Sequence, residues 1–284
     1  MKISSILVTG ASGKTGRAVI QSFLNKGYSV RALIHKSGSA APYSDQVVTF
    51  VGDLYSTHDL THAMEGATAV YHICPNMHPG EVNIGRQVIK VAKNSAVQHF
   101  VFHSVLHPQI KEMPHHWNKM LVEGILFKSG LTYTILQPSA YMQNILQYKK
   151  AILEQNVYAV PYNGETRIGM VDLEDVAEAA ATIICQPRHF GAIYELSSDE
   201  TLSQNELVQL ISRIRQKEVR FEEISRERWV KDMHQIGMDD YAITTLVRMF
   251  EYYETYGFRG NGTVLRAILD RAPISMTHFI EKYF

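Results

Sequence analysis

The sequence predicts an α/β fold, a doubly wound parallel sheet with a smaller, mainly helical C-terminal lobe on the substrate side. Two observations predict this fold class. Short apolar runs alternate with amphipathic stretches through the first half of the 284-residue chain, as they do in βαβ units. A glycine-rich turn joins the first of these runs to the first amphipathic stretch.

A series of apolar runs is expected to form the strands of this sheet. The runs at 69–73 and 100–102 are nearly continuous in apolar residues, which is typical of strands covered by helices on both faces. The expected strands lie at 3–9, 28–34, 47–51, 68–74, 98–104 and 131–136.

After residue 155 the pattern changes to short strands and then to helices. Ser203 and Glu206 have the spacing of a capping box, in which each side chain accepts a hydrogen bond from the other residue's backbone amide, and a helix is expected from there to about residue 217. The other elements expected in this part are a strand at 157–160, a turn at 161–164, a helix near 174–186, a strand near 192–196, and helices near 225–236 and 240–256.

Charge and cysteine content exclude several classes of protein. Basic and acidic residues balance at 28 each, so no overall field favours nucleic acid or an anionic membrane surface. The two cysteines, Cys74 and Cys185, show no CxxC or Cys/His spacing, which argues against a disulfide framework and against a metal site. No secretory h-region is apparent, and no apolar run approaches the roughly 18 residues of a membrane span. We therefore expect a cytoplasmic protein without a membrane partner.

The glycine-rich turn predicts a bound dinucleotide. Gly10, Gly13 and Gly16 follow the first strand and open a helix, and such glycines let backbone amides approach a pyrophosphate at the positive end of that helix. The intervening residues Ser12, Lys14 and Thr15 offer further donors. The P-loop of nucleoside triphosphatases is excluded, because it needs a glycine where Val8 stands. A glycine-rich turn with no ligand is the alternative.

The sequence also predicts how the chain is organised into parts. No repeat, low-complexity tract or flexible linker interrupts the sequence, so residues 1–284 are expected to form one structural unit. Within it, 1–156 and about 172–196 are expected to form the dinucleotide-binding core of Rossmann type. The remainder, about 157–171 and 197–284, is expected to pack on the sheet as a lid, with a cleft between the two.

The ribose end of the expected site favours NADP slightly over NAD. An NAD-specific site places an acidic residue after the second strand, but no Asp or Glu occurs from 28 to 44. Arg31, His35 and Lys36 stand there instead, and such donors suit a 2′-phosphate. The alternative is that Arg31 and Lys36 are solvated surface charges.

Two further strand ends are assigned to the cofactor. Asp53, followed by Leu54, comes directly after the third strand, where a carboxylate can accept from the adenine amino group. Pro75 follows the fourth strand on the expected path of the cofactor. His72 and Cys74 flank this point and are interpreted as packing residues.

The chain resembles the NmrA-like branch of the atypical short-chain dehydrogenase/reductase superfamily, which includes nitrogen-metabolite repressor proteins, a redox-sensor subgroup and quinone or dye reductases. The resemblance implies a Rossmann core that binds NAD or NADP, without fixing an activity. Many NADP-preferring members have arginine where His35 stands. The similar segments lie at 7–16, 30–35, 52–54, 131–138, 141–144 and 171–177.

The resemblance implies catalytic positions, and this sequence departs from one of them. Lys119 matches the lysine of the superfamily's Tyr-x-x-x-Lys motif, which holds the nicotinamide ribose, but no tyrosine occurs between Tyr71 and Tyr133. His115 stands four residues before Lys119, on the same helix face, and is a candidate proton donor. The alternative is a histidine that only decorates the helix start after Pro114.

The remaining candidate residues follow the fifth and sixth strands. Ser104 lies near the superfamily's catalytic serine or threonine, although strand-end serines are often structural. The resemblance places the Pro138 backbone at the nicotinamide carboxamide, and Tyr141 and Asn144 are expected to begin the next helix and line the substrate pocket. Asp172 is expected to cap a helix, and Asp175 is assigned no chemistry. The aromatic residues at 241–258 are interpreted as core.

Two functions fit these observations. The first is an NAD(P)H-dependent oxidoreductase that reduces a small organic acceptor, a quinone or a conjugated carbonyl, since quinone-type acceptors need little acid catalysis. The second is a non-catalytic NAD(P) redox sensor that regulates a protein partner. The missing tyrosine favours the sensor, whereas an intact Lys119 favours the enzyme, to which the balance leans.

Overall fold

The computed structural model describes residues 5–35 and 46–284, and the chain divides into two compact units. The first unit comprises Met1–Gln109, His116–Gln137 and Val176–Tyr194. The second comprises Ile110–His115, Pro138–Asp175 and Glu195–Phe284. The roles of cofactor-binding core and C-terminal lobe stay predictions.

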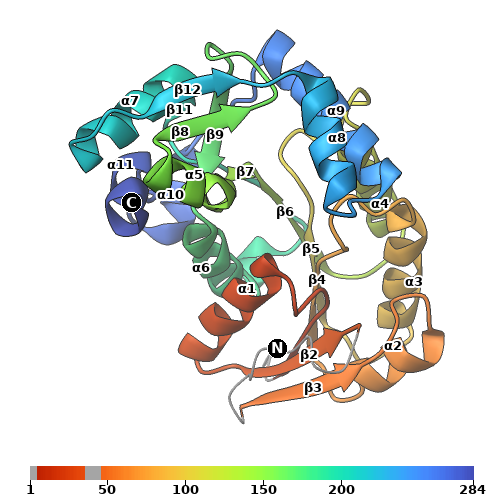
Figure 1. Ribbon diagram of the computed structural model, residues 1–284. Helices are drawn as coiled ribbons and strands as arrows, with labels where there is room; N and C mark the ends of the chain where they lie inside the picture. The colour runs from red at the N-terminus through yellow and green to blue at the C-terminus, as the bar shows by residue number, and fades with distance from the viewer. Residues whose placement is uncertain (1–4, 36–45) are drawn as a thin grey trace. The chain divides into compact units, whose positions relative to one another are not determined.

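A seven-stranded sheet has the order β10-β6-β5-β4-β1-β2-β3, and the strands from β3 to β6 pair in parallel. The predicted fold class, a parallel sheet flanked by helices, is confirmed (Figure 1). The strands are β1 (Ser5–Val8), β2 (Ser29–Ile34), β3 (Val47–Val51), β4 (Ala69–His72), β5 (His99–His103), β6 (Tyr133–Pro138) and β10 (Ile193–Leu196).

The helices of the first unit cover this sheet because each has one apolar face. Leu7 of β1 joins a buried cluster with residues of α2 (Thr57–Met64), α3 (Glu81–Lys93) and α4 (Pro114–Phe127). Phe23 of α1 (Lys14–Asn25) packs edge-on against Tyr71, with ring centroids 5.8 Å apart. Figure 1 shows α1 on the opposite side of the sheet from α2 and α3. Alternate residues of the strands therefore face different helix layers.

The second unit contains two small sheets and most of the remaining helices. In one sheet β9 (Arg167–Val171) lies between β7 (Ala140–Tyr141) and β11 (Thr201–Ser203), and in the other β8 (Val157–Val160) pairs in parallel with β12 (Arg220–Glu223). The helices are α5 (Lys149–Glu154), α7 (Gln204–Arg215), α8 (Arg226–Gln235), α9 (Asp240–Tyr256), α10 (Thr263–Leu269) and α11 (Met276–Tyr283), while α6 (Leu173–Ile183) begins in this unit.

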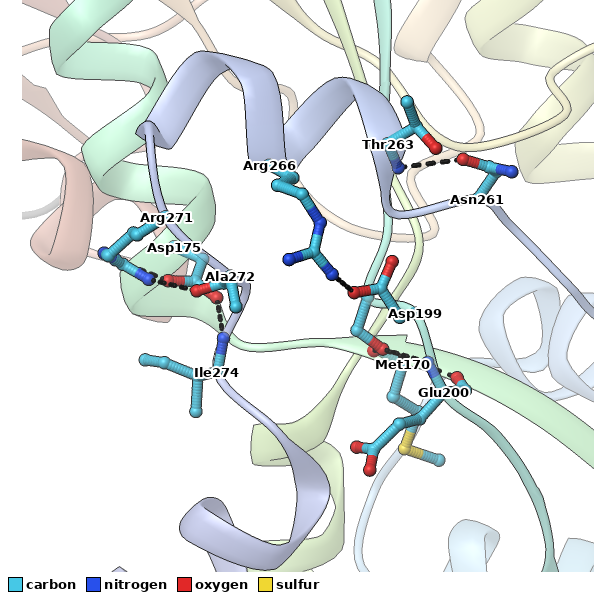
Figure 2. A network of polar contacts seen from close by, with 11 residues as sticks. Met170, Asp175, Asp199, Glu200, Asn261, Thr263, Arg266, Arg271, Ala272 and Ile274 are labelled. Atoms are coloured by element: carbon cyan, nitrogen blue, oxygen red, sulfur yellow. Dashed lines mark hydrogen bonds and ion pairs between the residues drawn. The ribbon is translucent and has the colours of Figure 1, made fainter.

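Helix caps in the second unit follow the sequence closely. The capping box of Ser203 and Glu206 is confirmed, with both hydrogen bonds present. The expected cap of α6 is confirmed too, because the Glu174 amide donates to Asp172 Oδ1 at 2.7 Å. Asp175 is fully buried and accepts from Arg271 Nη2 at 2.7 Å and from the Ile274 amide (Figure 2). These bonds give Asp175 a structural role.

The aromatic residues at 241–258 were predicted to be core, and the prediction is confirmed for only part of them. Phe250 and Tyr253 are buried, with Phe250 against Trp229 and Tyr253 stacked on Phe258. Tyr256 differs, because 69% of it is exposed. Throughout 5–35 and 46–284, no helix is both long and apolar enough to cross a membrane.

Candidate functional site

The glycine turn is a tightly packed loop between β1 and α1. Gly10 has φ +61°, and a Cβ added there would lie 2.9 Å from the Ile73 carbonyl oxygen that follows β4. A Cβ at Gly16 would lie 2.4 Å from the Gly10 carbonyl oxygen. This clash is with the backbone, so only a shift of the backbone itself could remove it. Both positions therefore require glycine, for conformation at Gly10 and for space at both.

The start of α1 is suited to an anion. Gly13 is the N-cap residue and is exposed, and a Cβ there would meet only the Gly10 carbonyl oxygen, at 3.3 Å. No side chain caps this helix and no acidic residue lies in its first turn, unlike α7 with its capping box. The first amides of a helix have no intrahelical acceptor, so the turn that holds Ser12, Lys14 and Thr15 fits a pyrophosphate.

The two basic residues of β2 differ in environment. Arg31 lies within the strand, where its Nε donates to the Ala63 carbonyl at 2.9 Å and its guanidinium lies 4.4 Å from the Phe50 ring centroid. These contacts favour a structural role for Arg31. His35 directly follows the last residue of β2 and is exposed, which suits a ribose phosphate. Lys36, the third donor of the sequence prediction, lies outside the described residues.

Asp53 already serves the loop after β3. Its Oδ1 accepts from the Tyr55 amide at 2.9 Å, while its own amide donates to Asp59 Oδ2. The Asp53 side chain is exposed, so its second oxygen can still accept from adenine. Leu54 is half-buried and packs against the core of the first unit. Pro75 is exposed and lies three residues beyond the end of β4.

His72 and Cys74 are buried, as their assignment as packing residues predicts. His72 Nδ1 lies 2.8 Å from Thr9 Oγ1, and its ring stacks on Phe102 at 5.8 Å between centroids. Burial, with a contribution from the Lys119 charge, lowers the pKa of His72 to about 3. Burial raises the pKa of Cys74 to about 12, so this thiol is not a nucleophile at neutral pH.

Lys119 forms a buried ion pair. Its Nζ donates to Glu81 Oε1 at 2.5 Å and lies 5.8 Å from the centroid of the Phe102 ring. The side chains of Lys119 and Glu81 are 13% and 2% exposed. Burial alone lowers the pKa of Lys119, but Glu81 and other acidic neighbours outweigh burial and raise it, so the ammonium stays charged. In the part of the chain described, Glu81 is the hydrogen-bond acceptor of this ammonium, so two of its three N–H groups can serve a ligand.

Ser104 belongs to a second buried polar cluster, which the sequence did not reveal. It directly follows β5 and donates to Glu123 Oε1 at 2.5 Å, and Gln137 Nε2 donates to the same oxygen at 2.9 Å. Burial raises the pKa of Glu123, although these donors act in the opposite direction. The four-residue spacing of Lys119 and Glu123 on one helix was a signal for this second site residue. Glu81 gave no such signal, because it comes from a different helix.

Two histidines open α4. His115 is its second residue, one helical turn before Lys119, and is buried. The Nδ1 of His116 instead faces the His107 carbonyl at 3.2 Å, and burial lowers the pKa of His116 to about 4. This contact directs the His116 ring toward the backbone of His107.

The last predicted site residues follow β6. Pro138 is the final residue of this strand. Tyr141 ends the short strand β7, and Asn144 lies exposed in a 3-10 helix, Met142–Tyr148. Tyr141 is the N-cap residue of this 3-10 helix, with an extended backbone that pairs with Val171 of β9, so the helix itself begins one residue later than predicted.

The first unit therefore collects the glycine turn, the ends of β4 and β5 and the Lys119 ion pair within one fold. A family model described as the NmrA-like family matches residues 2–283 of this chain. The chain belongs to the NmrA-like family. The resemblance inferred from its segments is thereby confirmed, and it extends over nearly the whole sequence.

Several relatives of this NmrA-like protein are reductases by name. An NAD(P)H azoreductase of Xenophilus azovorans is 28% identical over 238 residues, which cover 83% of this chain and 82% of that protein. Quinone oxidoreductase 2 of Escherichia coli is 26% identical over 238 residues, with 83% of each chain covered. The crystal structure of an NADPH-dependent quinone oxidoreductase of Escherichia coli, complexed with NADPH, matches with a TM-score of 0.86 at 23% identity, covering 98% of this chain and 99% of that one. This structural likeness shows a common fold.

Proposed function

We propose that this NmrA-like protein is an NAD(P)H-dependent oxidoreductase that reduces a small organic acceptor, a quinone or a conjugated carbonyl. The observation that carries the proposal is the largely buried, charged Lys119, which among the described residues keeps two N–H groups available, in the same unit as a glycine turn that fits a pyrophosphate. The names of the azoreductase and quinone oxidoreductase relatives support this class of reaction. The two free cysteines accord with the cytoplasm, where we place the activity.

Each part of the site has a binding role in this proposal. The amides of the Gly10–Gly16 turn hold the pyrophosphate, and the Asp53 carboxylate accepts from adenine. His35 meets the 2′-phosphate, so NADP is preferred slightly over NAD, while Arg31 contacts the Ala63 carbonyl of α2. The two available N–H groups of Lys119 bind the hydroxyls of the nicotinamide ribose, and the Pro138 backbone faces the carboxamide.

The chemistry needs few groups from the protein. When bound, the reduced nicotinamide supplies a hydride to the acceptor. Lys119 fixes the ribose, which orients the donor, and Ser104 can donate to an acceptor oxygen only when its hydroxyl turns away from Glu123 Oε1. The balancing proton comes from His115 or from water, and Tyr141 and Asn144 line the pocket on the acceptor side. Orientation provides most of the acceleration for a quinone, whose reduction needs little acid catalysis.

The test is oxidation of NADPH and NADH by the purified protein with a panel of quinones, azo dyes and enones. We expect turnover with at least one acceptor, and a lower turnover for Lys119→Met. A matched His115→Ala variant tests the proton donor, since unchanged turnover would assign the proton to water. Tight dinucleotide binding without turnover of any acceptor would contradict the reductase.

That outcome would favour the second candidate, a redox sensor that binds NAD(P) and regulates a protein partner. The absence of tyrosine between Tyr71 and Tyr133 is the observation in its favour, because the usual proton donor of the superfamily is missing. A sensor would show dinucleotide-dependent binding of that partner and no steady-state consumption of NADPH.

A further inference from the structure

Lys119 and Glu81 are brought together from two helices that the sequence separates. Glu81 is the first residue of α3 and Lys119 lies in the second turn of α4, 38 positions later in the sequence. In the first unit the Glu81 side chain is buried and that of Lys119 is 13% exposed, and Nζ and Oε1 are 2.5 Å apart. This pair does not act as a stabilising surface salt bridge. Removing two charges from water costs more free energy than an exposed ion pair contributes to stability.

The surroundings of Lys119 make this carboxylate essential to its charge. An ammonium transferred from water into a buried site loses its hydration, and buried lysines can lose about 3 to 5 pKa units when no carboxylate compensates. The other acidic groups near Lys119 affect its pKa less, since Glu81 makes the largest contribution after burial. The titratable groups that face this ammonium are Glu81 on α3, Cys74 after β4, His72 on β4, His103 on β5, and His116 and Glu123 on α4.

We propose that Glu81 is a positioning residue of the dinucleotide site, which holds the Lys119 ammonium in place and keeps it charged for the nicotinamide ribose. This inference rests on the proposed function, because Glu81 acts on the dinucleotide only through Lys119. Glu81 itself needs no contact with the ligand. If Glu81 has this role, cofactor affinity depends on a carboxylate that is far from the glycine turn in the sequence.

The first experiment measures NADPH binding to the full chain by fluorescence as a function of pH. The wild-type dissociation constant at the same pH is the reference, because Lys119 stays charged in the wild type between about pH 6 and pH 9 and titration of the ligand phosphate is common to both proteins. For Glu81→Gln we expect a dissociation constant about tenfold larger near pH 8.5 that approaches the wild-type value near pH 6, where Lys119 regains its proton. Glu81→Asp should restore most of the affinity. A Glu81→Gln curve parallel to that of the wild type would overturn the proposal.

A double-variant cycle separates positioning from structure. In a Lys119→Met background, Glu81→Gln should have no further effect on NADPH affinity, whereas a merely structural Glu81 would weaken binding equally in both backgrounds. Glu65→Gln is the matched control, since it makes the same chemical change on a side chain that is 73% exposed, and affinity should stay unchanged.

A second readout does not depend on the cofactor. The Lys119 side-chain NMR signal, assigned with Lys119→Met, should titrate in the neutral range in Glu81→Gln and remain that of a charged ammonium to alkaline pH in the wild type. If the wild type binds no dinucleotide, the proposed function fails while this titration still decides the role of Glu81. A Lys119 that stays charged without Glu81 would refute the inference even if NADPH binds.

Discussion

Acid should unfold the first unit because its sheet carries buried, neutral histidines. Burial lowers the pKa of His72 to about 3, that of His99 to about 4 and, with the nearby charge of Lys119, that of His103 to about 3. Their rings are held by neutral partners, as when His103 Nδ1 lies 2.6 Å from the Tyr71 hydroxyl and His99 Nε2 lies 2.9 Å from Thr134 Oγ1. Protonation is therefore resisted in the folded chain and free in the unfolded one.

The sign and size of the effect follow from linkage. Because the folded-state pKa values lie below the ordinary 6.5, the unfolded chain binds more protons as pH falls from 6.5 toward 4, and stability falls over that window. About pH 5 lies roughly 1.5 units below the unfolded-state pKa of each imidazole. For each histidine this difference lowers the free energy of unfolding by about 2 kcal/mol. His72, His99 and His103 together give about 6 kcal/mol, comparable with the whole stability of a domain. The raised pKa of Glu123 acts in the opposite direction, because the folded state takes up that proton more readily.

The assay is urea unfolding at about pH 7 and about pH 5, followed by Trp117 fluorescence in a Trp229→Phe background, so that the signal comes from the first unit. His72→Asn and His99→Gln should each reduce the acid-induced loss by about 2 kcal/mol. His58→Gln is the control, since the His58 side chain is 91% exposed and its replacement should leave the loss unchanged. A total loss below about 2 kcal/mol, or buried-histidine variants that keep the full loss, would refute this reasoning.

Further predictions concern the turn, the cofactor preference and the second unit. Gly16→Ala should abolish NADPH binding, because its Cβ would lie 2.4 Å from the Gly10 carbonyl oxygen, whereas Gly124→Ala, with open space around it in α4, should retain binding and raise stability by about 1 kcal/mol; calorimetric titration and thermal unfolding check both. His35→Asp should weaken NADP binding about tenfold and spare NAD, since an added carboxylate repels the 2′-phosphate, and an unchanged ratio of the two dissociation constants would count against the ribose assignment. Asp175→Ala should lower the free energy of unfolding by about 3 kcal/mol, because it removes a fully buried carboxylate that accepts from the partly exposed Arg271 and from the Ile274 amide. The exposed pair of Asp199 and Arg266 is the contrast (Figure 2), and Asp199→Ala should cost less than about 1 kcal/mol in the same denaturation assay.

Local signals in the sequence explain why much of the fold was predictable. The strands at 47–51 and 157–160 and the helix at 240–256 coincide with β3, β8 and α9, because their apolar periods and caps are strong. Local signals are weaker for the short strands β7, β9, β11 and β12, whose pairing partners are distant along the chain. Strand β6 begins at Tyr133, two residues later than expected, since only a hydrogen-bonded neighbour defines where a strand starts.

In the candidate site, too, roles that depend on local structure were predictable and roles that depend on distant contacts were not. The glycine turn was readable because a tight turn and a close backbone approach demand glycine at fixed spacings, and Gly10 and Gly16 meet both demands. Arg31 looked like a phosphate ligand because its charge is visible in the sequence, whereas its contacts with Ala63 and Phe50 are set by the packing of α2 and β3. The sequence therefore shows that position 31 carries a positive charge, whereas the fold determines which groups contact it.

The missing tyrosine has a narrower consequence once Glu81 is considered. In the superfamily's motif the lysine both holds the ribose and assists the tyrosine, so losing the tyrosine removes a proton donor. Glu81 of α3 holds the Lys119 ammonium of α4 and, with other neighbours, raises its pKa. Cofactor binding and proton donation are thus separable in this chain. Variants at Glu81 should change dinucleotide affinity and its pH dependence, and variants at His115 should change turnover of acceptors that need a proton in the transition state.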